Sequence, residues 1–190
     1  MKENTKFILL AVLLVIIVAL AAALYPKLSR QYQSENTVPA ETKENTENAI
    51  GFTVYDTDGN AVSLSDMTGK PTVINFWATW CRYCVEELPI FHHYAKEYMD
   101  EINFMMVDLP DGYRETKEKA LAFAKNEGYD FPIYFDSDGS ASNAYQIQSI
   151  PMTLLIDRDG NLYKIHIGLM NEAALKQYIE ILTDETNDNQ

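Results

Sequence analysis

Mostly apolar runs of β-branched and aromatic residues predict the strands of this chain. "TVINFW" (72–77) and "INFMMVD" (102–108) have the composition of strands that are covered on both faces. "GFTVYDTDGNAVSLSDM" (51–67) predicts a small hairpin that turns at Asp58-Gly59-Asn60. The other predicted strands are "FPIYFD" (131–136), "MTLLID" (152–157) and "LYKIHIG" (162–168), with the turn "RDGN" between the last two.

Between the strands, apolar residues recur every three or four positions, which predicts helices. The first is expected over about 82–98, with an apolar stripe from which Glu86 and Glu87 are excluded: Cys84, Leu88, Phe91, Ala95 and Tyr98. Others are expected at 114–128, ending at Gly128, at 140–145, and after a capping Asn171, where the apolar face is Ala174, Leu175, Tyr178, Ile179 and Leu182. This alternation predicts an α/β fold with a mixed sheet and helices on both faces.

The amino terminus has the pattern of a membrane anchor. Residues Phe7–Tyr25 are 19 consecutive residues without a charge, and at about 1.5 Å per residue they approach the roughly 30 Å hydrocarbon core of a bilayer. We expect an uncleaved signal-anchor within residues 1–28, because the run exceeds the roughly 7–15 apolar residues usual in a cleaved signal peptide. The alternative is cleavage near Ala21–Ala23. Positive charges flank the run on both sides, so they indicate no orientation.

Composition and charge define the remaining organisation. Residues 29–49 are polar and predict a flexible tether, residues 50–183 predict the folded domain, and residues 184–190 a disordered tail. The charges before residue 50 cancel, so the net charge of −13 belongs to residues 51–190. An acidic surface of this kind repels nucleic acid, which argues against nucleic-acid binding.

The chain has only two cysteines, Cys81 and Cys84, and they stand where the strand 72–77 gives way to a helix. Reactive groups favour the carboxyl ends of such strands, and the first turn of a helix stabilises an anion. A cysteine there has a lowered pKa, and its thiolate is the nucleophile. We predict that Cys81 attacks a substrate disulfide and that Cys84, one turn further into the helix, resolves the mixed disulfide.

Three other readings of the cysteine pair are weaker. A structural zinc site needs four ligands, and the histidines 92, 93 and 166 are expected to be surface or packing residues. A peroxidase would need a peroxide-binding environment before its nucleophile, which Trp80 and the nearby partner cysteine do not suggest. An inert bridge across two residues would remove little entropy from the unfolded chain. We therefore predict no metal and no cofactor beyond a redox-active Cys81–Cys84 disulfide.

The segment "FWATWCRYC", with Pro89 five residues after the second cysteine, resembles the active site of the thioredoxin superfamily. "SIPMTLLID" supplies the other hallmark, Ile150-Pro151 at the start of a strand. The resemblance implies a thioredoxin-like fold in which the bond before Pro151 is cis and the backbone of Ile150 pairs with substrate. Trp80, Ile150 and Pro151 are accordingly predicted to bind substrate.

Further features are similar to the membrane-anchored TlpA/ResA-type thioredoxin-like proteins of bacteria. Asn75 stands where cytosolic thioredoxins usually carry a buried Asp, and the hairpin, the insertion between 108 and 147, and the anchor match that layout. Members commonly have Pro where this chain has Tyr83, and some have Glu where it has Arg82. Arg82 and Asn75 are predicted to tune the cysteine pKa. Without an acid in that turn or at position 75, no obvious group takes the proton from Cys84. The predicted helical phase is unfavourable for Glu87 and leaves Glu86 undecided.

The resemblance implies a tethered thiol–disulfide oxidoreductase whose domain lies outside the cytoplasm. We expect it to act mainly as a reductase of protein disulfides, such as an apocytochrome c haem-binding motif or a secreted repair enzyme. A membrane thiol transporter would supply electrons, and the bilayer would be contacted through residues 7–25. The alternatives are an oxidase of the same fold and a metal-binding assembly chaperone that uses the same two thiols.

Overall fold

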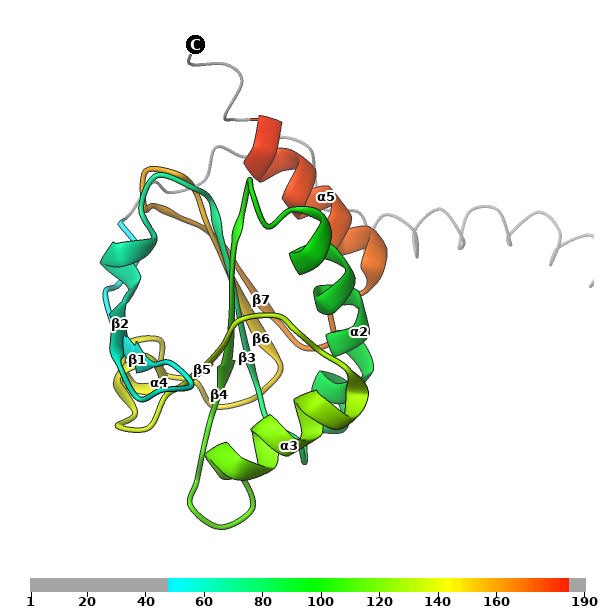
Figure 1. The fold of residues 1–190 in the computed structure, drawn as a ribbon. Coiled ribbons are helices and arrows are strands. Elements are labelled where there is room, and N and C mark those ends of the chain that lie inside the picture. The colour runs from blue at the N-terminus through cyan, green and yellow to red at the C-terminus, as the bar shows by residue number, and fades with distance from the viewer. Residues whose placement is uncertain (1–47, 185–190) are drawn as a thin grey trace, which may run out of the picture. The chain divides into compact units, whose positions relative to one another are not determined.

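A mixed seven-stranded sheet forms the centre of the part of the chain that the structure describes, residues 48–184 of a computed structural model (Figure 1). Its strand order is β2-β1-β5-β4-β3-β6-β7. The strands are β1 (Thr53–Tyr55), β2 (Ala61–Ser63), β3 (Thr72–Trp77), β4 (Asn103–Asp108), β5 (Ile133–Phe135), β6 (Met152–Ile156) and β7 (Leu162–Ile167). β3, β4 and β5 run parallel to one another, and all other neighbours are antiparallel. This confirms the predicted mixed sheet.

Helices cover both faces of this sheet, as predicted. α2 (Arg82–Glu97), α3 (Lys117–Glu127) and α5 (Glu172–Asp184) lie on one side in Figure 1. The short α4 (Ser140–Ala144) and the 3₁₀ helix η1 (Leu64–Met67) lie on the other side. The parallel order β3-β4-β5 requires crossover connections, which α2 and α3 supply.

The two faces of β3 divide the interior into two regions, because successive side chains of a strand point to opposite faces. Ile74 and Phe76 belong to an apolar cluster on the α4 side, together with Val54, Leu64, Met105, Val107, Met152 and Leu154. Asn75 and Trp77 face the other way, where Asn75 contacts α2 and the Trp77 ring lies 6.0 Å from that of Phe123 in α3. Polar groups are therefore buried on the side that carries the cysteine helix.

The two hairpins turn on closely similar sequences, "DTDGN" and "DRDGN". In each, the first aspartate accepts the backbone N–H groups two and four residues further on, and the glycine has a φ of +87°. A left-handed φ is accessible to glycine at little cost, so both predicted turns are explained by their sequence.

The observed helix boundaries agree with those predicted from the sequence, with one exception. α3 was expected from Arg114 but begins at Lys117, because the hydroxyl of Thr116 accepts a hydrogen bond from the backbone N–H of Lys119 and caps the helix there. Its end at the left-handed Gly128 is as predicted. Asn171 also caps α5 as predicted, through a 2.9 Å bond from the N–H of Ala174.

The predicted anchor at 7–25 and nearly all of the tether and tail lie outside the described residues. No helix between residues 48 and 184 is both long and apolar enough to span a bilayer. At the start of the described region, Asn48 forms a β-bridge with Asn161, and the N–H of Ala49 donates to the carbonyl of Gly160. Asn48 and Ala49, which the sequence assigns to the tether, thus make contacts with the turn after β6.

Candidate active site

β3 leads directly to the cysteine pair at one end of the sheet. After Trp77 the chain makes a tight turn, in which the N–H of Cys81 donates to the carbonyl of Ala78. Cys81 is the N-cap residue of α2: its Sγ accepts a 3.2 Å hydrogen bond from the N–H of Cys84, with which it forms a disulfide. In the reduced protein this N–H and the positive end of the helix dipole would stabilise a thiolate on Cys81.

The two cysteines differ in exposure. Cys81 keeps 6% of its surface exposed, whereas Cys84 is completely buried. This asymmetry is a property of their places on the helix, since Cys81 caps its end and Cys84 belongs to its buried face.

Ile150 and Pro151 lie beside Cys81, although they are about 70 residues away in sequence. The carbonyl oxygen of Ile150 is 3.6 Å from the Sγ of Cys81, and the peptide bond to Pro151 is cis, as the resemblance implied. Pro151 is buried and Ile150 half-buried. The start of β6 brings them there, because β6 pairs antiparallel with β3 and its first residue lies opposite Phe76.

Residues next to Cys81 and between the two cysteines have exposed side chains. Trp80 is 46% and Tyr83 58% exposed, and Arg82, the first residue of α2, is also exposed. The guanidinium of Arg114 lies 4.2 Å from the centre of the Trp80 ring. This is a cation–π contact, so the tryptophan next to the nucleophile has a partner from the loop after β4.

Glu87 is the main difference between the predicted and the observed site. The predicted helical phase placed it off the apolar stripe, but it is completely buried, one turn after Cys84 on the same face of α2. Its Oε1 accepts a 2.7 Å hydrogen bond from the amide of Asn75, and its Oε2 accepts one of 2.7 Å from the N–H of Met170. The polar residues opposite allow a carboxyl group to occupy this face.

Burial raises the pKa of Glu87 to about 7, while the hydrogen bonds from Met170 and Asn75 act in the opposite direction. A carboxyl that gains and loses its proton near neutral pH is suited to proton transfer. Asn75 also donates to the hydroxyl of Thr153, so it joins β3, β6 and α2. The residue predicted to tune the cysteines thus contacts Glu87.

Two further buried carboxyl groups lie near the cysteine loop, and the sequence did not predict their burial. Glu115 and Asp108 are both completely buried. Glu115 accepts hydrogen bonds from the N–H and hydroxyl of Thr79, at 2.6 and 2.7 Å. Asp108 accepts no side-chain hydrogen bond from the described residues, and burial, followed by the charges of Glu115 and Asp111, raises its pKa to about 8. The one indication in the sequence was Asp108 itself, a charged residue at the end of a predicted buried strand.

The histidines are exposed or half-buried and contact residues other than the cysteines. His92 bonds to the carboxylate of Asp130 at 2.6 Å and contacts the rings of Tyr129 and Phe131. Between residues 48 and 184, no three His, Cys, Asp or Glu side chains gather as a metal site requires.

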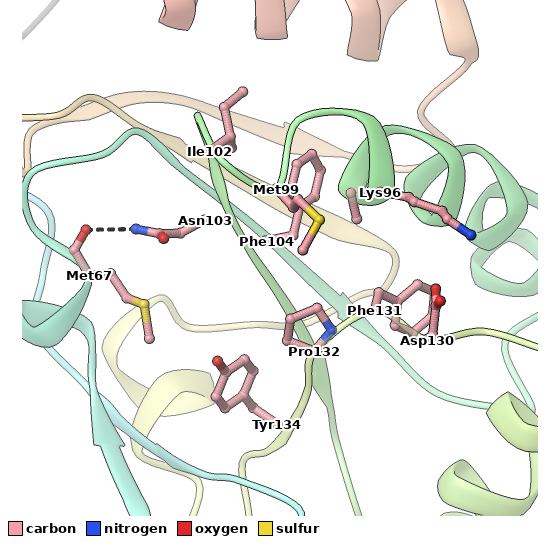
Figure 2. A pocket seen from close by; sticks show the side chains of 11 residues that line it. Met67, Lys96, Met99, Ile102, Asn103, Phe104, Asp130, Phe131, Pro132 and Tyr134 are labelled. Atoms are coloured by element: carbon pink, nitrogen blue, oxygen red, sulfur yellow. Dashed lines mark hydrogen bonds between the residues drawn. The ribbon is translucent and has the colours of Figure 1, made fainter.

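A pocket of about 350 Å³ lies at the opposite end of the sheet, where β4 begins (Figure 2). Met67, Met99, Phe104, Asp130 and Tyr134 are among its lining residues, and beside it the amide of Asn103 donates to the carbonyl of Met67. It contains neither cysteine nor any of the predicted site residues. This pocket is therefore separate from the predicted site around Cys81.

The fold and the site together define a thiol–disulfide oxidoreductase of the thioredoxin superfamily. The sheet is thioredoxin-like, the two cysteines form a disulfide at the start of a helix, and a cis-proline lies next to it. The sequence matches the Redoxin family over residues 33–182, and the chain belongs to this family, among its ResA/StoA-like thiol–disulfide oxidoreductases.

Proteins similar to this chain include a named thiol-disulfide oxidoreductase and a named thioredoxin. The thiol-disulfide oxidoreductase ResA of Bacillus subtilis is 30% identical over 184 residues, which cover 95% of each chain. The exposed lipoprotein thioredoxin Etrx1 of Streptococcus pneumoniae is 32% identical, with a TM-score of 0.60 over 70% of this chain and 99% of its own. StoA of Bacillus subtilis is 28% identical, with a TM-score of 0.60 over 71% of this chain and 99% of its own.

Proposed function

We propose that this chain is a membrane-tethered, extracytoplasmic oxidoreductase that acts mainly as a reductase of protein disulfides. Cys81 attacks the substrate, and Cys84 resolves the mixed disulfide. The observation that carries the proposal is the asymmetry of the pair: Cys81 reaches the surface at the start of α2, and Cys84 is buried under it. That the protein exchanges thiols and disulfides follows from its family; the direction and the roles are the proposal.

The reaction moves two electrons from the dithiol to the substrate. The Cys81 thiolate attacks one substrate sulfur, the substrate S–S bond breaks, and the other substrate sulfur leaves as a thiolate that takes up a proton. The Cys84 thiolate then attacks the Sγ of Cys81, which forms the internal disulfide and releases the second substrate thiolate. The product is the oxidised state seen in the structure.

Glu87 is the group we assign to take the proton from Cys84. The two residues are one turn apart on the buried face of α2, and the pKa of Glu87 near 7 allows it to accept a proton at neutral pH. Asn75 tunes the site through its hydrogen bond to Glu87. Arg82 adds a positive charge next to Cys81 and favours the thiolate there.

Substrate binds on the surface around Cys81. Trp80 offers an exposed aromatic face, and the half-buried Ile150 next to the buried Pro151 offers backbone groups within reach of the same sulfur. An extended segment carrying the target disulfide can lie between them, with its backbone along Ile150.

The tether and the partners complete the proposal. Residues 7–25 hold the chain in the membrane, and residues 29–49 allow the domain to reach substrates on the extracytoplasmic side. A membrane thiol transporter re-reduces the Cys81–Cys84 disulfide. The electrons pass to a protein disulfide, such as the haem-binding motif of an apocytochrome c or a secreted repair enzyme.

The reduction potential of the full-length protein in detergent tests the direction. A value at or below about −270 mV, that of thioredoxin, supports a reductase, while a value near the roughly −120 mV of a strong oxidant would identify an oxidase. Reduction of insulin disulfides should be lost in Cys81→Ser. Stoichiometric copper or zinc binding by the reduced protein, without insulin reduction, would instead support the metal-chaperone alternative.

A further inference from the structure

Two loops are joined by side-chain contacts next to Cys81. Arg114 and Glu115, in the loop after β4, contact Trp80 and Thr79 in the loop before Cys81. The carboxylate of Glu115 accepts both hydrogen bonds from Thr79, and the guanidinium of Arg114 lies over the ring of Trp80. Thr79 and Trp80 immediately precede Cys81. The cysteine loop is thus fixed from outside its own segment by two residues.

The backbone of Glu115 is itself held in a loop that hydrogen bonds close. Its N–H donates to Oδ1 of Asp111 at 2.9 Å, and its carbonyl accepts the N–H groups of Asp111 and Gly112. Lys119 of α3 donates to the carbonyls of Tyr113 and Arg114, at 2.9 Å each. The loop therefore forms a rigid support, which we call the clamp loop, residues 109–116.

The bonds from Thr79 to Glu115 are short, and they lie at a completely buried side chain, where a hydrogen bond is stronger than in water. Burying a polar side chain is costly unless it is hydrogen-bonded, and the partner of Glu115 is the residue next to Trp80.

We propose that Glu115 is a positioning residue for disulfide exchange: through Thr79 it fixes Trp80 beside Cys81, and the clamp loop forms one wall of the substrate-binding surface. This rests on the proposed role of Trp80 in binding a protein substrate. Arg114 stacks on Trp80, and Tyr113, which is 85% exposed, extends the wall outward. The clamp loop then contributes to recognition of a protein segment, and its effect on a small disulfide is slight.

The test compares a protein disulfide with a small disulfide in the full-length protein in detergent. Glu115→Gln and Thr79→Val should each raise KM for insulin reduction about tenfold and change kcat less than twofold. The rate with a small aromatic disulfide should stay within twofold of the wild type. Thr79→Ser, which retains the hydroxyl, should restore the wild-type KM. Glu127→Gln, an exposed glutamate at the far end of α3, serves as the matched control.

Fluorescence gives a second readout that a purely structural role would not change. Of the two tryptophans, Trp77 is buried and Trp80 is exposed, so acrylamide quenching reports mainly on Trp80. Quenching should increase in Glu115→Gln and Thr79→Val and remain unchanged in the control. If Glu115→Gln does not fold, Thr79→Val alone carries the test.

Two outcomes would overturn this inference. One is an unchanged KM for insulin in Thr79→Val. The other is an equal loss of activity with insulin and with the small disulfide, which would mean that the loop affects only the fold or the reactivity of Cys81. Both leave the proposed function intact, because that function depends on activity that Cys81→Ser abolishes. A wild-type protein that does not reduce insulin would instead remove the proposed function itself.

Discussion

The amide of Asn75 donates a 2.7 Å hydrogen bond to Oε1 of Glu87 in the buried layer between β3 and α2. This bond and that from Met170 favour the charged form of Glu87, while burial favours the neutral form. The pKa of about 7 is the balance of these opposing effects. A buried group that titrates near neutral pH, one turn from Cys84, can couple proton transfer to disulfide exchange.

Replacing this carboxyl should alter the pH dependence of the reaction. As the pH falls through about 7, Glu87 takes up a proton and can no longer accept the one from Cys84, so turnover should fall. Glu87→Gln, which keeps the shape but cannot accept a proton, should lower kcat for insulin reduction about tenfold at pH 7.5 and remove the inflection near pH 7. Steady-state rates between pH 5.5 and 9 measure both effects.

Glu86→Gln is the matched control, because Glu86 is exposed and adjacent in sequence. It should leave the rates and the inflection as in the wild type. An inflection near pH 7 that survives in Glu87→Gln would assign it to another group, and Glu87 would have no part in proton transfer.

Asp108 predicts a pH dependence of stability. Its folded-state pKa of about 8 is above its ordinary value, so the folded protein binds a proton more tightly than the unfolded chain. The stabilisation is complete below about pH 4 and is lost as the pH rises through about 8. Since one pKa unit corresponds to about 1.4 kcal/mol, the effect is on the order of a few kcal/mol. Glu87 contributes with the same sign up to about pH 7.

Asp108→Asn should therefore be more stable than the wild type at pH 8.5 and should show a weaker decrease in the free energy of unfolding between pH 5 and 8.5. Urea unfolding of the full-length protein in detergent at several pH values measures the difference. Asp100→Asn, at an exposed position, should retain the wild-type slope. An Asp108→Asn slope equal to that of the wild type would contradict the raised pKa.

The amino-terminal segment predicts where the protein is found. If residues 7–25 are an uncleaved anchor, the expressed chain should sediment with membranes, resist extraction by high salt and alkaline carbonate, and have an intact mass that includes these residues. A chain that begins at Lys27 should remain in the soluble fraction. A mature protein that starts after Ala23 would show that the segment is a cleaved signal peptide.

The sequence predicted the sheet and the position of the cysteines well, because these depend on local patterns. The run Thr72–Trp77 is a strand buried at every residue, and the helix after Cys81 begins and ends within one residue of its predicted limits. The start of α3 was placed too early because the polar segment before Thr116 is compatible with a helix. In the structure Thr116 caps the helix, and the residues before it form a loop whose Glu115 bonds to Thr79 on another loop.

The buried carboxyl groups could not be found from the sequence for a related reason. A helical stripe is recognised by its apolar residues, so Glu87 was assigned to the solvent side of α2, although it stands three residues after Cys84. Its burial depends on partners that are distant in sequence, Asn75 and Met170. Asp108 and Glu115 likewise become a pair only when the loop after β4 folds back over the end of β3.

The most direct test of the account is to identify the cysteine that bonds to substrate. Full-length Cys84→Ser and Cys81→Ser, each reduced and then mixed with a peptide that contains a disulfide, are quenched with acid and analysed by mass spectrometry. We expect a stable mixed disulfide on Cys81 in Cys84→Ser and almost none on Cys84 in Cys81→Ser, because Cys84 is buried. Equal adducts on both cysteines, or an adduct on Cys84 alone, would contradict the assigned roles.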